Sequence, residues 1–273
     1  MRDQRPGLDV PPRAIYHRLH PCVCWRGDPD RRAAQGSLRV MHVYIDGARQ
    51  PLGAGFDDYL NPGRTAVVSI DLHRGHLEDD PDCPCPAPRA RAIVGGVNRF
   101  HAAARAAGVP VIHVRSTLRK GGVDDIAGIP SAWRRVFPLH VGPIPNSDGH
   151  AIEGSRWTEF VTEVDDRDLV VSGKKRLSAF YPTDLDFLLR NMGVEALILN
   201  GCLADCCVLN TAFDGSNMGY RVTVLRDLVA GTTEDLEAAS LKIVAMHLGL
   251  VADAEDLLGA WQERQPAAKK RAG

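Results

Sequence analysis

An acid/base-assisted nucleophile can be assembled from three residues of this sequence, Asp71, Lys174 and Cys207. Asp71 and Lys174 each lie at the end of an apolar stretch, and Cys207 lies in a cysteine cluster that follows a third. If these stretches are parallel strands, their carboxyl ends meet at one edge of the sheet, where a crevice opens. A carboxylate, an ammonium group and a thiol brought together there would favour nucleophilic catalysis.

The cluster GCLADCCV contains three of the chain's seven cysteines, Cys202, Cys206 and Cys207. A zinc site takes four ligands at spacings such as two Cys-x-x-Cys pairs, and the sequence has no partner pair near this cluster. Adjacent Cys206 and Cys207 cannot easily form a disulfide with each other. We expect Cys202 and Cys206 to be small buried side chains that do not react.

Cys207 differs from its neighbours by its position in the predicted helix. The loop GCLAD leaves a predicted strand, and the helix begins near Asp205, a residue type suited to the N-cap. A thiol in the first turn faces the positive end of the helix dipole, which lowers its pKa. Free backbone N–H groups at the same place can bind a developing oxyanion. We therefore expect Cys207 to have a lowered pKa.

Short apolar runs alternate with helical patterns along most of the chain. Apolar runs without polar alternation indicate strands buried on both faces, and therefore a parallel sheet. Apolar residues three or four positions apart indicate helices between these strands. One predicted helix has its apolar face at Leu236, Ala239, Ile243 and Met246. The predicted strands are 65–72, 109–116, 167–174, 195–201, 220–227 and 249–253.

The composition is that of a globular chain able to bury a large core, with 273 residues, 44% apolar and 25% charged. The formal net charge of −1 gives no reason to expect nucleic acid or an acidic membrane surface as a partner. No apolar run approaches the ~20 residues of a membrane span, and the N-terminal sequence lacks the apolar segment of a secretory signal. The odd number of cysteines favours reduced thiols, so we expect a cytoplasmic protein.

The two ends of the chain differ from its middle. Residues 1–60 are expected to form a poorly ordered N-terminal arm, because the first 40 are rich in Arg and Pro without periodicity. Residues 1–40 could also result from a mis-called translation start, with Met41 as the true one. The predicted domain covers residues 61–263, and residues 264–273 are expected to form a frayed tail.

Several motifs resemble those of the isochorismatase-like cysteine hydrolases, over roughly residues 60–260. They are SIDLHRGHL, the pattern Lys-x-x-x-Ser-Ala-Phe-x-x-Thr-x-Leu, the pattern Gly-x-x-x-x-x-Cys-Val, and GYRVTVLRD. The resemblance implies a Rossmann-like three-layer α/β/α fold with a mainly parallel sheet. It also implies a catalytic triad of Asp71, Lys174 and Cys207. Lys174 is selected over Lys175 because the family places three residues between the lysine and the serine, here Ser178.

The resemblance further implies how the site would work. The family's cis peptide would join Cys202 to Leu203, and the N–H groups of Leu203 and Cys207 would form the oxyanion hole. The implied reaction is hydrolysis of a C–N bond in a small amide, through a thioester and with release of ammonia. Isochorismatases proper hydrolyse a vinyl ether without this cysteine, so Cys207 argues against that reaction. We also expect a homo-oligomer, a dimer or a tetramer.

The substrate class is judged from residues near the predicted strand ends. Nicotinamidases of the family have an Asp-x-His…His metal site after the second strand, but here no histidine lies between His113 and His140. We therefore expect an enzyme without metal or cofactor, acting on a ureide or carbamoyl compound such as biuret, N-carbamoylsarcosine or ureidoacrylate. A nicotinamidase-type amidase is the alternative.

Two residues are predicted to contact the substrate, His76 and Arg115. His76 would line the pocket beside a polar, planar ureide, and Arg115 would bind a substrate carboxylate. A salt bridge from Arg115 to Asp227 or to another acidic residue of a loop is the alternative. His73 and His76 form an H-x-x-H pair, a possible metal motif, but the sequence offers no evident third ligand. His73 is expected to pack or cap locally.

Three further interpretations concern the loops and the function class. Trp133 and His140 belong to a segment that could act as a lid or a subunit contact, and His247 could reach the pocket or lie in an interface. A dinucleotide-binding oxidoreductase would share the strand–helix alternation, but G-x-G-x-x-G is missing after the first strand. A catalytically inactive relative acting as a binding protein would be expected to lack an intact triad.

Overall fold

A six-stranded parallel sheet forms the centre of the computed structural model, which describes residues 40–264. Its strands follow the order β5-β4-β3-β6-β7-β8, and every neighbouring pair is parallel. The strands are β3 (Thr65–Ile70), β4 (Val111–Ser116), β5 (Leu169–Lys174), β6 (Ala196–Cys202), β7 (Arg221–Ala230) and β8 (Gly249–Ala252). Each lies within three residues of its predicted bounds. The prediction of a mainly parallel sheet is confirmed.

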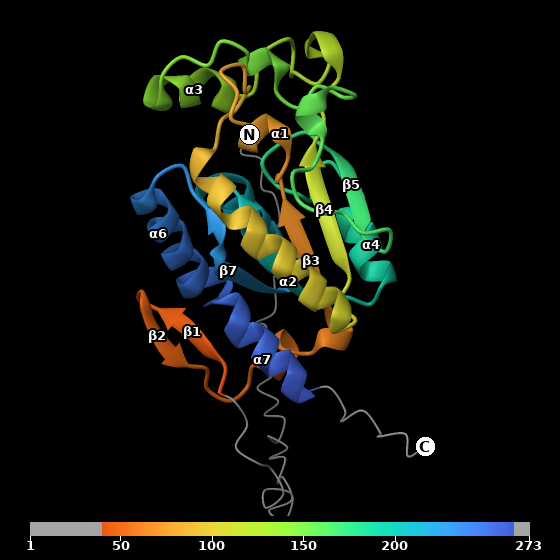
Figure 1. Cartoon of the computed structure of the whole chain (residues 1–273), viewed down its shortest axis with the longest axis vertical. Helices are drawn as coiled ribbons and strands as arrows, with labels where there is room; N and C mark the ends of the chain where they lie inside the picture. Colours follow the sequence, from red (N-terminus) through yellow and green to blue (C-terminus); the bar gives the residue numbers. More distant parts are fainter. Residues whose placement is uncertain (1–39, 265–273) are drawn as a thin grey trace, which may run out of the picture. The chain divides into compact units, whose positions relative to one another are not determined.

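Helices cover both faces of this sheet, which gives three layers (Figure 1). Helices α2 and α7 pack on one face through Phe100 and Trp261, and α4 and α5 pack on the other through Leu189 and Ala212. Within residues 40–264, no helix is long and apolar enough to cross a membrane. The helices are α1 (Arg74–Leu77), α2 (Val94–Ala106), α3 (Ala132–Val141), α4 (Leu185–Asn191), α5 (Leu209–Asn217), α6 (Glu234–Ile243) and α7 (Ala254–Arg264), with π-helical turns η8 (Ala204–Val208) and η9 (Val244–Leu248).

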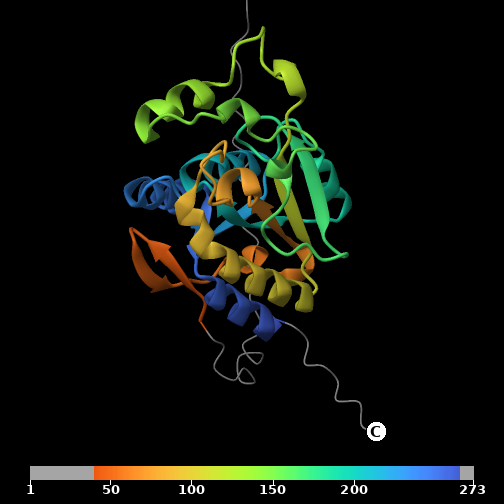
Figure 2. The same cartoon turned by 45° about the horizontal axis from the view of Figure 1, so that its top comes forward.

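The strand order reverses direction at β3, because the chain passes from β3 to β4 and β5 on one side and then returns to β6 on the other. Ligands of open parallel sheets bind at such a switch point, outside the carboxyl ends of the strands. The segment that contains α3 lies over these ends, as two views of the domain show (Figures 1 and 2). The topology therefore gathers the residues that follow β3, β4, β5 and β6 under this segment.

The predicted arm of residues 1–60 is corrected in its second part. Residues 42–51 form an antiparallel hairpin of β1 (His42–Ile45) and β2 (Ala48–Pro51), which contacts β8. Its two-residue turn, Asp46-Gly47, has positive φ at both positions, as an Asp-Gly type I′ turn requires. Val43 is buried in the core, so the domain begins before residue 61. The predictions for residues 1–39 and 265–273 lie outside the described residues.

The predicted apolar face of helix α6 is also corrected. Leu236, Ala239 and Ile243 of α6 and Met246 of η9 are exposed, whereas Ser240 of α6 and Val244 of η9 are buried. A buried serine is tolerated here because its hydroxyl donates to the Leu236 carbonyl at 2.7 Å. Because the buried face of the helix includes the polar residue Ser240, the pattern of apolar residues in the sequence did not indicate this face.

The close approach of β3 and β6 predicts a large difference between two glycine substitutions. Gly201 has φ 115°, and a Cβ there would lie 2.1 Å from the Ile70 carbonyl oxygen, whereas Gly193 has φ 67° and no atom within 4 Å of its Cβ position. Gly201→Ala should lower the free energy of unfolding by about 3 kcal/mol, and the control Gly193→Ala by about 1 kcal/mol. Urea unfolding would measure both. Equal midpoints for the two variants would contradict this packing.

Candidate active site

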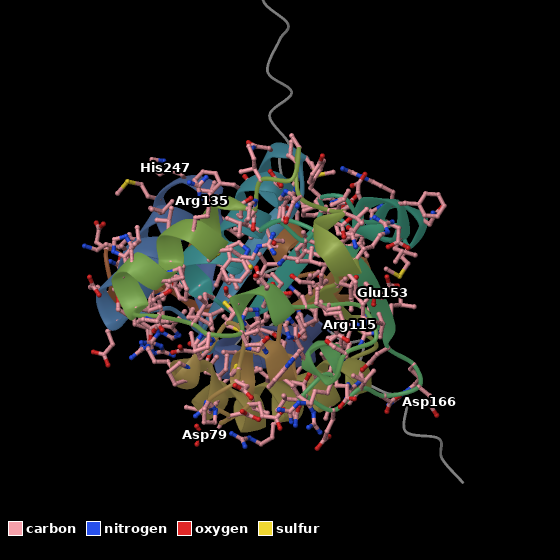
Figure 3. The ribbon with its side chains drawn as sticks, turned by 90° about the horizontal axis from the view of Figure 1, so that it is seen from above. Asp79, Arg115, Arg135, Glu153, Asp166 and His247 are labelled. Atoms are coloured by element: carbon pink, nitrogen blue, oxygen red, sulfur yellow. The ribbon has the colours of Figure 1, made fainter. Side chains whose placement is uncertain are left out.

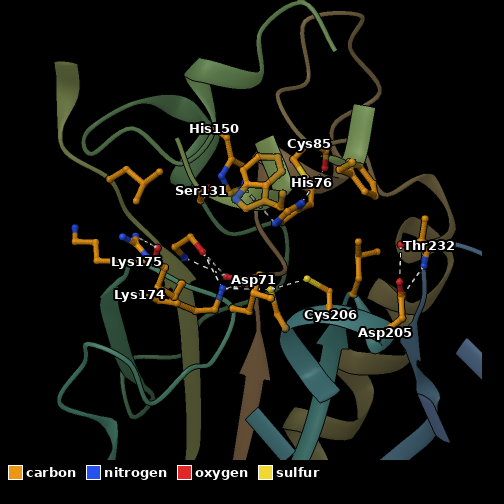
Figure 4. Close-up of a pocket in the computed structure, with 18 of the residues that line it drawn as sticks. Asp71, His76, Cys85, Ser131, His150, Lys174, Lys175, Asp205, Cys206 and Thr232 are labelled. Carbon is orange, nitrogen blue, oxygen red and sulfur yellow. Dashed lines mark hydrogen bonds and ion pairs between the residues drawn. The ribbon is translucent and has the colours of Figure 1, made fainter. Parts of the chain in front are cut away.

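A cavity of ≈ 240 Å³ opens at the carboxyl ends of the strands, where the switch point lies. Asp71 and Lys174 line one side of it, and His150 lines the opposite side (Figure 4). Cys207 and Trp133 also line the cavity. Cavities for drug-sized ligands are typically larger, at about 300–1,000 Å³. The cavity therefore suits a small molecule.

The three predicted residues meet around one ammonium group. Lys174 Nζ donates to Asp71 Oδ2 at 2.5 Å and lies 3.3 Å from Cys207 Sγ. The side chains of Lys174 and Asp71 are 2% and 0% exposed, so this ion pair is removed from water. Asp71 follows β3 with a positive φ of 53°, an uncommon conformation that aspartate tolerates better than most residues. The predicted convergence of the strand ends is confirmed.

Ser116, which was not predicted from the sequence, forms hydrogen bonds with both Asp71 and Lys174. It ends β4, and its N–H and hydroxyl lie 3.0 Å and 3.3 Å from Asp71 Oδ1. Lys174 Nζ donates to Ser116 Oγ at 2.9 Å. The carboxylate of Asp71 is thus held on both oxygens. Its signal in the sequence was only its place as the last residue of the predicted strand 109–116.

The charges of Asp71 and Lys174 are set by their contact. Burial alone would raise the pKa of Asp71, but the charge and hydrogen bond of the Lys174 ammonium, with His73 and His76, together lower it, so the net pKa is low. Burial alone would lower the pKa of Lys174, but the charge and hydrogen bond of the Asp71 carboxylate, with the sulfur atoms of Cys207 and Cys206, together raise it. Both groups are therefore charged at neutral pH.

The predicted low pKa of Cys207 is wrong for the site without substrate. The pKa of the Cys207 thiol is raised by its hydrogen bond to Cys206 and by burial, against the opposing charge of Lys174. The two sulfur atoms lie 4.0 Å apart, and Cys207 donates. The prediction failed because it left out the neighbouring Cys206 thiol and burial, which together outweigh the Lys174 charge. Cys207 therefore rests as a thiol.

Cys206 is not the inert buried residue that was predicted. It is half-buried and lines the cavity, and its pKa is lowered by the hydrogen bond from Cys207. Cys202 agrees with its prediction, because it is fully buried and burial raises its pKa. The five described cysteines are all free thiols.

The chain that carries Cys207 has an unusual course. The peptide bond between Cys202 and Leu203 is cis, as the family resemblance implied. The Leu203 carbonyl then accepts from the N–H groups of Cys206 and Val208, which flank Cys207. This π-type spacing leaves the Cys207 N–H outside the contacts of that carbonyl. Leu203 and Cys207, the predicted oxyanion-hole residues, both line the cavity.

Asp205 does not have the capping role that was predicted for it. The helix turn begins after Leu203, without a side-chain cap. The Asp205 carboxylate instead accepts from the N–H and the hydroxyl of Thr232, at 2.7 Å and 2.8 Å. Asp205 therefore joins the cysteine turn to the loop that follows β7.

The prediction that Arg115 binds substrate is corrected. Its guanidinium donates to Ser172 Oγ at 2.9 Å and to the Thr158 carbonyl at 2.9 Å, and it stacks over Phe160. Arg115 does not line the cavity, and the alternative salt bridge to Asp227 does not form either. The reason is strand alternation, because the next residue, Ser116, contacts Asp71. His247 is exposed and lies at the periphery of the domain (Figure 3).

His76 lines the cavity, as predicted, and has two histidine neighbours there. His73 stacks against it with ring centroids 4.6 Å apart, and His150 Nε2 lies 3.4 Å from His76 Nε2. His150 is the third histidine that the sequence did not reveal, because it lies 74 positions from His76. The rings of Trp133 and His150 are in edge contact with centroids 4.7 Å apart, and Trp133 lines the cavity; the lid and the subunit contact both stay predictions. His140 is exposed.

The comparisons with known proteins agree with this geometry. The family described as the Isochorismatase domain matches residues 65–256. N-carbamoylsarcosine amidase of Arthrobacter sp. is 29% identical over 177 residues, which cover 64% of this chain and 63% of that relative. Ureidoacrylate amidohydrolase RutB of Methylobacterium radiotolerans is 31% identical over 231 residues, 78% of this chain and 86% of that protein.

A solved structure of similar fold is that of a cysteine hydrolase from Pseudomonas syringae pv. phaseolicola 1448A. Its TM-score is 0.67 at 26% sequence identity, and the match covers 78% of this chain and 98% of that one. The chain spans slightly less than two thirds of the length of the N-carbamoylsarcosine amidase that it matches.

The hydrogen bond between the two thiols predicts a shift in the reactivity of Cys207. Cys206→Ala removes the main cause of its raised pKa, so Cys207 should be alkylated by iodoacetamide at a lower pH than in the unchanged protein. Peptide mass spectrometry against pH would measure the midpoint. Cys83→Ala, outside the cavity lining, is the control and should leave the midpoint unchanged. An unchanged or higher midpoint in Cys206→Ala would refute the pairing.

Proposed function

Because the chain belongs to the isochorismatase family, we propose that it is a cysteine-dependent amidohydrolase of a small ureide or carbamoyl compound. The observation that carries the proposal is the contact of Lys174 with both Asp71 and Cys207 in the lining of a small cavity. A buried, paired carboxylate beside a thiol is a general base next to a nucleophile. The names of the relatives, N-carbamoylsarcosine amidase and ureidoacrylate amidohydrolase, support the same class.

In the proposed first step Asp71 takes the proton of Cys207 as the sulfur attacks the substrate carbonyl. A new S–C bond forms, and the carbonyl electrons move to oxygen. Lys174 stabilises the thiolate through its 3.3 Å contact and keeps the Asp71 carboxylate in place. The N–H groups of Leu203 and Cys207 are the proposed donors to the oxyanion.

In the second step the C–N bond breaks as the oxyanion collapses. Asp71 returns the proton to the leaving nitrogen, which departs as ammonia or an amine and leaves a thioester on Cys207. Water, deprotonated by the same carboxylate, then attacks the thioester carbon. The C–S bond breaks, and the proton returns to Cys207 sulfur, so the enzyme is restored.

The cavity supports a substrate that also bears a carboxylate. Lys175 and Arg176 line it, in place of the predicted Arg115. Lys175 lies 3.5 Å from Asp124 Oδ2, whereas the Arg176 guanidinium donates to two backbone carbonyls, those of Lys175 and Asp124. Carbonyl oxygens satisfy its N–H groups without cancelling its charge. We therefore favour carboxylated members of the class, such as N-carbamoyl amino acids, over biuret.

The proposed triad predicts the effect of two substitutions on ammonia release. Cys207→Ser and Asp71→Asn should each lower kcat about 1,000-fold or more on the best ureide, and the double variant should be no worse than either. Cys206→Ala should stay within about tenfold of the unchanged enzyme, because its sulfur lies outside the Lys174 contact. The assay is ammonia release from ureides, N-carbamoyl amino acids and nicotinamide.

Two results would redirect this proposal. Turnover of nicotinamide in preference to every ureide would favour the nicotinamidase-type alternative. No turnover of any amide, with Cys207 unreactive toward iodoacetamide at every pH, would favour an inactive relative that acts as a binding protein.

The charge of Arg176 predicts a change in substrate affinity. Arg176→Gln should raise KM for an N-carbamoyl amino acid about tenfold or more and leave KM for its neutral amide nearly unchanged. Arg135→Gln removes an exposed cation of α3 and is the matched control (Figure 3). Equal effects of Arg176→Gln on the charged and the neutral substrate would contradict a carboxylate contact.

A further inference from the structure

Three buried histidines cluster beside the cavity, two of them line it, and the proposed amide reaction uses none of the three. One ring nitrogen from each of His73, His76 and His150 lies within 4.8 Å of the others. The side chains come from two separate parts of the chain, the turn after β3 and the loop before η7 (Arg156–Thr158). His76 and His150 line the cavity on the side opposite Asp71 and Lys174 (Figure 4).

We propose that His73, His76 and His150 form a binding site for a divalent transition metal, zinc above all, with an open coordination position toward the cavity. Neutral imidazole is a common ligand of zinc, copper, iron and nickel. The Asp-x-His…His pattern of metal-dependent nicotinamidases is missing here, and two of these ligands, His73 and His76, come instead from the turn after β3.

The spacing of two of the nitrogens fits a tetrahedral zinc site, and the His73 nitrogen lies within 4.8 Å of both. Two nitrogens bound at a Zn–N distance of about 2.0–2.1 Å and a tetrahedral angle lie about 3.3 Å apart. The distance between His76 Nε2 and His150 Nε2 is 3.4 Å. Three protein ligands and one open position are the usual arrangement of a catalytic zinc site.

The tautomer of His76 is already fixed for metal binding. Its Nδ1 lies 2.8 Å from the Cys85 carbonyl oxygen, which can only accept, so Nδ1 carries the proton. The lone pair of neutral His76 is then on Nε2, facing His150. A ligand histidine oriented by a backbone carbonyl through its other nitrogen is the common outer contact of zinc sites.

A hydrogen bond between two imidazoles does not account for all three rings. His150 could donate Nε2–H to His76, but the fully buried His73 Nε2 would still lack a hydrogen-bond partner. Asp71 Oδ1 lies 3.8 Å away, beyond hydrogen-bond distance. Leaving such a nitrogen unsatisfied costs about 1–3 kcal/mol, which a metal bond would offset.

The surroundings of the three histidines favour uncharged imidazole rings and allow the rings to pack closely. Burial lowers the pKa of His73 to about 3, and burial likewise lowers the pKa of His76 and His150, so the lone pairs are free at neutral pH. A Cβ at Gly75 would lie 3.1 Å from His73 Nδ1 and 2.9 Å from the Trp157 carbonyl oxygen. Glycine therefore lets the His73 ring and the Trp157 backbone pack closely at the cluster.

The test measures metal binding without substrate, so it is independent of the proposed amide reaction. The full chain is stripped with a chelator, incubated with zinc, desalted and analysed for metal by mass spectrometry. We expect about one zinc per chain, and at least tenfold less in His150→Gln. The control His247→Gln removes an exposed histidine and should bind like the unchanged protein.

Cobalt distinguishes the histidines from the thiols of Cys85, Cys206 and Cys207, which also line the cavity. Cobalt bound to the three histidines should give weak visible bands without the intense near-ultraviolet band of thiolate ligation, and Cys207→Ala should leave this spectrum unchanged. Added zinc should raise the Tm of the stripped unchanged protein but not that of His150→Gln.

Three results would overturn the site. They are no retained zinc in the unchanged protein, equal zinc in His150→Gln, or a thiolate band that Cys207→Ala abolishes. If His150→Gln fails to fold, the cobalt spectrum of the unchanged protein alone decides between histidine and thiolate ligation.

Discussion

The ion pair of Lys174 and Asp71 is the interaction on which the rest of the site depends. A buried ammonium is costly unless a partner and further hydrogen bonds compensate it. Here the compensation spans three adjacent strand ends, since β5 supplies Lys174, β4 supplies Ser116 and β3 supplies Asp71. The compensation of the buried ammonium therefore requires that β3, β4 and β5 be neighbours in the sheet.

The same ion pair also affects the protonation states of the site without substrate. The hydrogen bond to Cys206 and burial raise the pKa of the Cys207 thiol by more than the Lys174 ammonium lowers it, and the Asp71 carboxylate raises it further. The proposed nucleophile would form only as the proton moves to Asp71 during attack. His73 of the histidine cluster lies next to this pair, with its Nε2 3.8 Å from Asp71 Oδ1, so the charge of a metal bound there would act on Asp71.

The sequence predicted the parts of the site that follow from strand ends. Asp71, Lys174 and the cysteine turn come directly after buried strands, and a parallel sheet brings such ends together. The prediction that Arg115 faces the cavity was wrong because successive side chains of a strand point to opposite faces of the sheet. The next residue, Ser116, is the one that contacts Asp71. His150 was missed because a loop folds it onto His76, and loop paths leave no periodic signal. The hairpin turn Asp46-Gly47 did carry a readable signal, which was overlooked within a polar segment.

The central claim is that Cys207 sulfur bonds covalently to the substrate carbonyl carbon. Acid quenching during turnover of an N-carbamoyl amino acid, followed by peptide mass mapping, tests it most directly. We expect the acyl mass on Cys207 within the peptide that also contains Cys206, and its absence in Cys207→Ser. Turnover with the acyl group on Cys206, or with an active Cys207→Ser variant, would contradict the account.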